Sequence, residues 1–169
     1  MTAFPHQIST YILAGVLIVS SVGCDRLTKE IARAQLQESE TVKISGGIVL
    51  LSYTENPGAM LSVGAALSEQ TRFWVFTVGV GILLAGMAAV LVFSGNLSPS
   101  LVSGLSLMFG GGASNLADRI LHDGRVVDFI SIGLAGLRTG VFNIADVAIT
   151  FGFLIVLIPA FRRRKDHPE

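Results

Sequence analysis

Four long apolar segments dominate the sequence and restrict what it can fold into. They cover residues 8–24, 72–93, 100–117 and 141–161, and each has about the length that a helix needs to cross the hydrocarbon core of a membrane. Hydrophobic residues make up 51% of the chain and charged residues only 14%, whereas roughly 25% of an average soluble domain is charged. We therefore expect an all-α integral membrane protein with four transmembrane helices.

The basic residues predict how these helices are oriented. Four spans place both termini on the same side of the membrane. The run RRRK at 162–165 follows the fourth segment directly, and basic residues next to a span end favour the cytoplasmic side. Both termini are therefore predicted to be cytoplasmic, with the connections 25–71 and 118–140 on the outer, periplasmic face. The other eight Lys and Arg residues fall on that outer face, so the prediction depends on the C-terminal cluster.

The first segment has a second interpretation. Residues 21–24 (SVGC) look like the processing box of a lipoprotein signal peptide. A signal peptide begins with a positively charged region, however, and residues 1–7 contain neither Lys nor Arg. A processed lipoprotein would also not need three further spans. We expect the first segment to be retained as a transmembrane helix.

Charge, cysteine and histidine content exclude several functions. The formal net charge is +0, which gives no electrostatic basis for nucleic-acid binding. Cys24 is the one cysteine, so the chain cannot form an internal disulfide. The histidines His6, His122 and His167 are scattered and lack the spacing of a metal site. We expect no metal and no other cofactor.

The connection 25–71 is predicted to carry a small sheet. Residues 26–37 read as a short helix that continues from the first span. Residues 41–45 and 49–53 have alternating or β-rich composition, with glycines at 46–47 as the turn between them. A sheet of this size cannot form a core of its own, so it must rest on the helices or on the lipid surface.

Small and turn-forming residues complete the expected architecture. Residues 56–59 (NPGA) turn the chain back towards the membrane, and Ser68 is a candidate N-cap for the second span. Residues 110–114 (GGGAS) give the third span a smooth patch that allows close helix packing. The whole chain, 1–169, is expected to be one membrane-embedded domain with an outer-face loop and sheet region.

Two aspartates beside apolar segments give the strongest functional signal. Asp128 has apolar neighbours within the connection 118–140, and Asp146 lies about a turn and a half into the fourth segment. A carboxylate near a membrane is costly unless it is paired, hydrated or used. Two such groups brought together push their pKa values apart, so that one acts as base and the other as acid. The alternative for Asp128 alone is a solvated loop position.

Other polar residues share helix faces with these aspartates. Asn115, Asp118 and Arg119 lie on one face of the third span, and Asn143 shares a face of the fourth with Asp146. Asp118 is predicted to be structural, because it can cap the helix end or pair with a neighbour. Arg119 could bind a lipid phosphate or a substrate carbonyl, since a guanidinium suits both.

Three residues of the connection 25–71 complete the candidate set. Asp25 and Lys29 are four positions apart just past the first span, an arrangement that favours a structural ion pair. Asn56 is either a turn residue or the donor of an amide hydrogen bond to a substrate backbone.

Together these motifs resemble the bacterial lipoprotein signal peptidases, the type II signal peptidases. The resemblance covers nearly the whole chain and is carried by five ordered blocks, which are DRLTK at 25–29, NPGA at 56–59, NLADR at 115–119, GRVVDFI at 124–130 and FNIAD at 142–146. It implies a four-helix aspartic endopeptidase of the bacterial inner membrane in which Asp128 and Asp146 are the catalytic pair.

The resemblance also implies a substrate and supporting residues. The substrate would be a prolipoprotein whose lipobox cysteine carries diacylglycerol, cut just before that cysteine near the periplasmic face. The enzyme would act as a monomer in membrane lipid. The residues that would support the substrate or the pair are Asn56, Gly58, Asn115, Arg119, Asn143 and Ala145, and the structural ones are Asp25, Lys29 and Asp118.

Three places depart from the family pattern. Ser114 stands where Gly is usual, residues 60–61 (ML) where Ala and Phe are usual, and Ser131 where Asp is common. None of them is one of the two aspartates.

Two other classes of function are compatible with parts of the sequence. A non-catalytic membrane protein of the same fold could bind lipoproteins, but it would not need both Asp128 and Asp146. A small transporter or proton relay would want acids deeper in the bundle and usually a repeated half, and the four apolar segments do not repeat.

Overall fold

The described residues form four long helical stretches and one small sheet. A computed structural model describes all residues except 1–2, 60–61, 96, 135 and 166–169. The helices are α1 (Ala3–Leu36), the short 3-10 helix η1 (Ser45–Gly47), α2 (Glu69–Arg72), the π-helical segment η3 (Phe73–Gly79), α3 (Val80–Phe93), α4 (Pro99–Leu121) and α5 (Ile144–Lys165). Because α2, η3 and α3 follow one another without a break, they form one continuous stretch.

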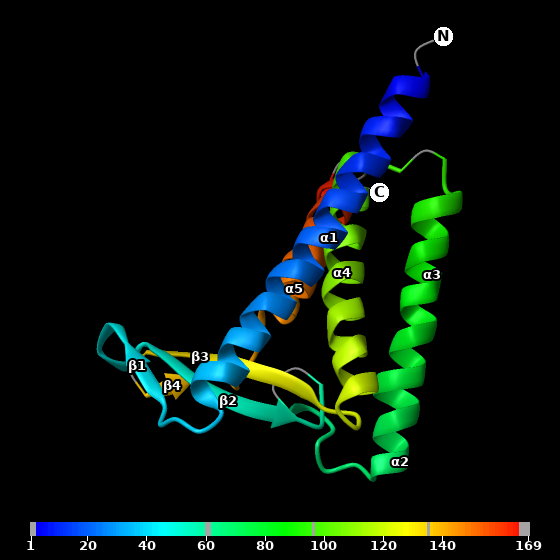
Figure 1. Ribbon diagram of the computed structural model, residues 1–169. Helices are drawn as coiled ribbons and strands as arrows, with labels where there is room; N and C mark the ends of the chain where they lie inside the picture. Colours follow the sequence, from blue (N-terminus) through cyan, green and yellow to red (C-terminus); the bar gives the residue numbers. More distant parts are fainter. Residues whose placement is uncertain (1–2, 60–61, 96, 135, 166–169) are drawn as a thin grey trace.

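Consecutive helical stretches run in opposite directions (Figure 1). The sheet lies at one end of the bundle, and α1 begins and α5 ends towards the other end. In the view of Figure 1, α4 stands between α3 on one side and α1 with α5 on the other. The described parts of α1 and α5 therefore begin and end at the same end of the bundle, and the side of the membrane that this end faces stays a prediction.

Length and composition identify two stretches as candidate membrane spans. They are Ser9–Leu36 and Glu69–Phe93, and Ile144–Leu157 is a shorter apolar helix. These two stretches agree with the first and second predicted spans. The third and fourth, 100–117 and 141–161, fall on α4 and α5, and their crossing of a membrane stays a prediction.

Large apolar side chains cover the outside of the helices. Val19 on α1 is 71% exposed, Ile82 on α3 is 69% exposed, and Phe93 at the end of α3 is 83% exposed. Water makes such a surface unfavourable, whereas lipid tails accept it. The outer surface of the bundle is therefore suited to a bilayer.

Three consecutive glycines let α4 pack closely on the other helices. An added Cβ would lie 2.8 Å from Ser21 Cβ of α1 at Gly110, 2.5 Å from the Ala145 carbonyl oxygen of α5 at Gly111, and 2.8 Å from Leu84 Cδ2 of α3 at Gly112. Each glycine thus faces a different helix. The predicted smooth patch is confirmed as a packing surface, and it brings α4 against all three neighbours.

The sheet has four antiparallel strands, β1 (Val42–Ile44), β2 (Val49–Asn56), β3 (Val126–Leu134) and β4 (Leu137–Arg138), in that order. The first hairpin agrees with the prediction. Its turn contains Gly46 at φ 67° and Gly47 at φ 92°, values that glycine adopts without a steric penalty. The second half of the sheet, β3 and β4, differs from the prediction of a loop for the connection 118–140.

Two further local predictions concern the segment before the second span. Ser68 caps α2 as expected, because its hydroxyl accepts a hydrogen bond from the Thr71 amide at 3.2 Å. Residues 60–61, where the sequence departs from the family pattern, lie outside the described residues.

Candidate active site

Asn143 caps the N-terminus of α5 and shapes the site around it. Its side-chain oxygen accepts a hydrogen bond from the backbone amide of Asp146 at 2.9 Å, and its backbone amide donates to Asp146 Oδ2 at 3.3 Å. This reciprocal pair is a capping box. It corrects the prediction that the helix begins near 141, because the cap makes Ile144 the first helical residue.

The same correction applies to Asp146. It was expected about a turn and a half into an apolar helix, but it lies in the first turn of α5. A carboxylate is favourable there, since the helix dipole is positive at the N-terminus. The Asn115 side-chain amide donates to Asp146 Oδ1 at 2.9 Å. Asp146 is therefore held from α4 and from its own cap.

Asp128 lies in β3 and is almost completely buried, so the solvated-loop alternative is wrong. Two side-chain amides donate to its carboxylate, Asn143 to Oδ1 at 2.6 Å and Asn56 to Oδ2 at 2.8 Å. Asn143 thus bonds to both aspartates. The two predicted acids, eighteen positions apart in the sequence, share one buried asparagine.

Burial dominates the protonation of Asp128. Desolvation raises the pKa of Asp128 to about 7, and the nearby charge of Asp146 also raises it. The hydrogen bonds from Asn56 and Asn143 act in the other direction, because they stabilise the ionised carboxylate. At neutral pH this carboxyl therefore exchanges readily between its acid and base forms.

Asp25 joins three helices at the base of the site. Its carboxylate accepts hydrogen bonds from Ser114 Oγ of α4 at 2.7 Å and from the Ala145 amide of α5 at 2.8 Å, and it pairs with Lys29 at 2.7 Å. The predicted Asp25–Lys29 ion pair is confirmed. It lies within α1, which continues without a break to Leu36.

Lys29 extends this support towards the two aspartates. Its ammonium group contacts Asp25 Oδ2 and Asp118 Oδ2, each at 2.7 Å, and donates to Asn115 Oδ1 at 2.8 Å. The three donors of an ammonium group are thereby matched by three acceptors. Asn115 is also the donor to Asp146, so Lys29 fixes the orientation of that amide.

Asp118 has a structural position and pairs with neighbouring side chains, as predicted. It pairs with Lys29 at 2.7 Å and with Arg26 at 3.0 Å, and it accepts a hydrogen bond from the Val127 amide at 3.3 Å. Val127 directly precedes Asp128. Asp118 therefore ties α1 and α4 to the strand that carries one of the two acids.

Arg119 connects α4 to the turn after β2. It donates from Nη2 to the Gly58 carbonyl oxygen at 2.8 Å. Gly58 in turn donates its amide to Asn56 Oδ1 at 2.9 Å, and the Asn56 amide also reaches the Ala59 carbonyl oxygen at 2.9 Å. An added Cβ at Gly58 would lie 2.6 Å from the Val63 carbonyl oxygen. The NPGA turn is thus folded against Asp128.

Ala145 contributes its backbone amide and its small size. Its amide donates to Asp25, and its carbonyl oxygen touches the Gly111 surface of α4. A larger side chain in this fully buried place would separate α4 from α5.

Two residues that supported no functional prediction gain roles from the structure. Ser114, noted only as a departure from the family pattern, donates to the buried Asp25. Arg26 pairs with Asp118. Both are adjacent in sequence to predicted residues, which was the available signal. Ser131, the other described departure, donates to the Thr139 carbonyl oxygen at 3.0 Å.

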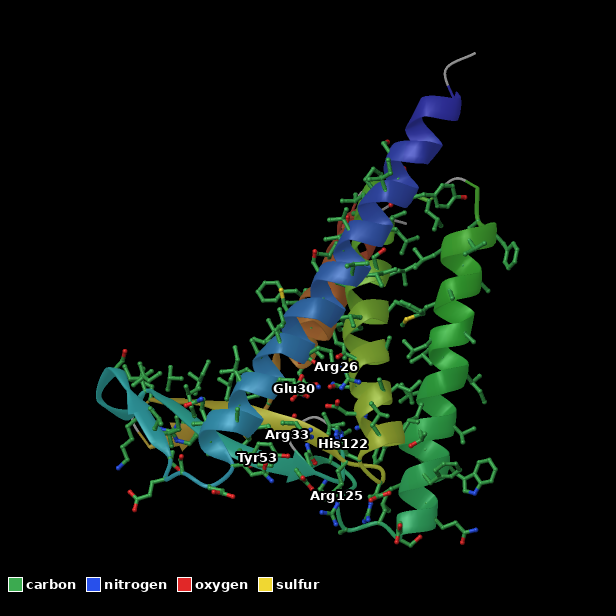
Figure 2. The ribbon with its side chains drawn as sticks, viewed as in Figure 1. Arg26, Glu30, Arg33, Tyr53, His122 and Arg125 are labelled. Atoms are coloured by element: carbon green, nitrogen blue, oxygen red, sulfur yellow. The ribbon has the colours of Figure 1, made fainter. Side chains whose placement is uncertain are left out.

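A second polar network surrounds the outer end of α1. Figure 2 shows Arg33 of α1 beside His122 and Tyr53, where α1 meets the sheet and the end of α4. Arg33 Nη2 lies 2.8 Å from His122 Nε2. Hydrogen bonds from Tyr53 and Arg125 lower the pKa of Glu55. This network continues the Arg26–Asp118 contact outwards and fixes the sheet on the bundle.

Metal binding has no support in the described part of the chain. No group of three or more His, Cys, Asp and Glu side chains is arranged to hold an ion there. His122 contacts Arg33, and His6 and His167 have side chains outside the described set.

Solved structures define the class of fold. Two chains, each described as a bacterial membrane enzyme, superpose with TM-scores of 0.74 and 0.71 at 24% identity. The first match covers 95% of this chain and 92% of the other. The fold is therefore that of these membrane enzymes, with helices and a small antiparallel sheet.

Sequence comparisons identify the family. The family model described as signal peptidase (SPase) II matches residues 17–162. A lipoprotein signal peptidase of Azoarcus sp. (strain BH72) is 34% identical over 91% of this chain and 85% of the relative. One from Moorella thermoacetica is 35% identical over 89% of this chain and 94% of the relative. The chain belongs to the signal peptidase II family.

Proposed function

We propose that this chain removes the signal peptide from prolipoproteins, with Asp128 and Asp146 acting together as the acid and base of an aspartic peptidase. Membership of the signal peptidase II family and the names of its relatives support the activity. The contact of Asn143 with both carboxylates is the observation that carries the choice of residues.

The charges around the site favour one retained proton. Four carboxylates, Asp25, Asp118, Asp128 and Asp146, face three cations, Arg26, Lys29 and Arg119. Asp25 and Asp118 are paired with Lys29 and Arg26, so the excess negative charge falls on the other two. Two close carboxylates share a proton readily, and one proton makes the cluster neutral.

The chemistry uses that proton in two steps. The ionised aspartate takes a proton from a water molecule, whose oxygen attacks the scissile carbonyl carbon, while the protonated aspartate gives its proton to the carbonyl oxygen. In the second step the C–N bond breaks, the amine leaves with a proton from the first aspartate, and a hydroxyl proton returns to the second. The pair ends in its starting state and titrates as a unit.

The substrate is positioned by the membrane. We propose that the enzyme lies in the bacterial inner membrane with both termini in the cytoplasm and the aspartates at the outer face. The lipobox cysteine carries diacylglycerol, and the bond cut is the one just before it. Acyl chains held in the bilayer would fix the depth of that bond, and such positioning can contribute many powers of ten to a rate. We propose that the enzyme acts as a monomer.

The test is cleavage of a diacylglyceryl-modified prolipoprotein by the purified protein in nanodiscs, beside the same prolipoprotein without the lipid. We expect cleavage of the lipidated form only, with the new N-terminus at the modified cysteine by mass spectrometry. Equal cleavage of both forms would reject lipid positioning. Binding without cleavage of several lipidated substrates by a folded wild type would instead support a lipoprotein-binding protein.

A further inference from the structure

The helical stretch that carries α2 and α3 changes its geometry beside the candidate site. Residues Phe73–Gly79 form a π-helix between two α-helical parts. Such segments are rare and are found frequently at functional sites. Phe76 lies in the middle of this one, with its ring centroid 5.8 Å from Arg119 Cζ.

The π-helix determines which side chain meets Arg119. Leu84 packs on Gly112 of α4, so its direction marks the face of this stretch that is turned to α4. In a continuous α-helix, position 77 would point about 20° from Leu84 and position 76 about 80° away. A π-helical turn takes up extra residues relative to an α-helical turn. It therefore rotates the residues before it relative to Leu84, in the direction that brings Phe76 towards Arg119.

Phe76 also contacts the turn that follows β2. An added Cβ at Gly64 would lie 2.6 Å from Phe76 Cζ, and Gly64 has φ +78°. The ring therefore fits between Gly64 and the Arg119 guanidinium. Arg119 reaches the same segment through its hydrogen bond to the Gly58 carbonyl oxygen.

We propose that Phe76 is a positioning residue that holds Arg119 and the segment around Gly58 and Gly64 in place against the aspartate pair. The contacts run from the Phe76 ring to Arg119, then to Gly58, whose amide binds Asn56, the donor to Asp128. The Arg119 guanidinium lies over the ring and is buried, and burial strengthens the attraction between a cation and an aromatic face. This inference rests on the proposed function, because its effect is exerted on turnover at that site.

The first test replaces the ring. Phe76→Leu removes the aromatic face and keeps an apolar side chain, and we expect kcat/KM for the lipidated prolipoprotein to fall roughly 5- to 30-fold, as for a desolvated cation–π contact. Phe93→Leu is the matched control, because Phe93 is 83% exposed at the far end of the same stretch. An equal effect of the two variants would overturn the proposal.

A second test separates the charge contact from simple packing. Fluorinated phenylalanines at position 76 keep the ring and its apolar surface but withdraw electron density from its face. We expect kcat/KM to decrease stepwise from phenylalanine through difluoro- to pentafluorophenylalanine. A flat series would overturn the proposed role of the ring face.

A third measurement does not depend on activity. The Ala59 amide donates to the Val63 carbonyl oxygen at 2.8 Å, and the Ala65 amide donates to that of Ser62 at 3.1 Å. We expect both amides to exchange hydrogen faster in Phe76→Leu than in Phe93→Leu, and unchanged exchange would contradict the inference. The wild type could fail to cleave any substrate while these amides still exchange faster in Phe76→Leu. That combination would support the placement of Phe76 and reject the proposed function.

Discussion

Asn143 is the residue on which the geometry of the aspartate pair depends most. Its side-chain nitrogen donates a hydrogen bond to the Asp128 carboxylate, and its side-chain oxygen accepts one from the backbone amide of Asp146. Its backbone amide donates to the Asp146 carboxylate. Only a side chain that both donates and accepts can bind one carboxylate and cap the helix that carries the other, and asparagine is among the best N-caps.

Asn143→Ser separates these two tasks. Serine is an equally good N-cap, but it is too short to replace the amide contact with Asp128. We expect kcat/KM to fall roughly 100-fold, in the range of a disrupted acid–base step, while the loss of Tm stays smaller than in Asn143→Ala, which also loses the cap. Enzyme assays and thermal unfolding of both variants check this, and wild-type activity of the serine variant would contradict it.

The hydrogen bond from Asn56 to Asp128 predicts a pH effect. This bond stabilises the ionised carboxylate and so lowers the pKa of Asp128, against burial that raises it to about 7. Removing it in Asn56→Ala raises that pKa further. If the pair needs its proton, wild-type activity declines as the pH rises through about 7, and the variant, although slower, declines at higher pH.

The measurement is kcat/KM across pH 5 to about 9 for the wild type, Asn56→Ala and Ser131→Ala, which removes a side-chain donor on the same strand as Asp128. Only the Asn56 variant is expected to move the alkaline limb. A limb that moves to lower pH would contradict the assigned role of this bond.

At the residue level the sequence predicted the membership of the site better than its geometry. Every predicted site residue lies in one connected cluster, because acids, amides and bases placed beside apolar segments have few other places to satisfy their hydrogen bonds. The capping box was missed because Asn143 was read as part of the helix. The order Asn-x-x-Asp ahead of an apolar run was the available signal for a helix start at Ile144.

Among the elements, α4 controls how closely the two halves of the site approach. Gly111 faces the Ala145 carbonyl oxygen of α5, one residue from Asp146. Any side chain there must push α5, and the acid at its N-terminus, away from Asn115.

Gly111→Ala is therefore expected to destabilise the protein by about 1–3 kcal/mol, as for overpacking of a core, and to reduce activity at temperatures where it is still folded. Gly86→Ala is the matched control, because no atom lies within 4 Å of its added Cβ. Thermal unfolding in detergent measures both. Equal Tm values for the two variants would contradict the packing described for α4.

The strand β3 and the π-helix η3 are two elements that the sequence did not predict. Four consecutive positions of β3, from Val126 to Phe129, are buried, so burial alternates only in part along residues 126–134. The sequence of such a strand lacks the regular apolar–polar alternation that predicts a strand, and it resembles an apolar loop as much. The π-helix was not predicted, because neither apolar periodicity nor helix caps distinguish a π-helical turn from an α-helical one.

At the scale of the whole molecule, the arrangement of helices predicts a topology. The sheet lies at one end of the bundle, whereas α1 begins and α5 ends towards the other (Figure 1). The basic run at 162–165 predicts that this second end faces the cytoplasm. The first two spans follow from hydropathy, whereas α4 and α5 carry polar residues that serve the site and weaken that signal.

Cysteine labelling tests this topology in a Cys24→Ser background. We expect Asp123→Cys, exposed beyond α4 at the sheet end, to react with an impermeant thiol reagent in spheroplasts. Ser94→Cys, exposed beyond α3 at the other end, should react only after the membrane is opened. The reverse pattern would mean that the orientation is inverted, and labelling of both in intact spheroplasts would contradict four spans.

The central claim is that Asp128 and Asp146 together perform the hydrolysis, and single-turnover cleavage of a diacylglyceryl-modified prolipoprotein by Asp128→Asn and Asp146→Asn tests it most directly. Asp123→Asn is the control, since it makes the same change at an exposed aspartate outside the pair. We predict that each of the first two variants loses about 100- to 10,000-fold in rate while still folding, and that the control keeps wild-type activity. Cleavage at the wild-type rate by either member of the pair would show that the catalytic groups lie elsewhere.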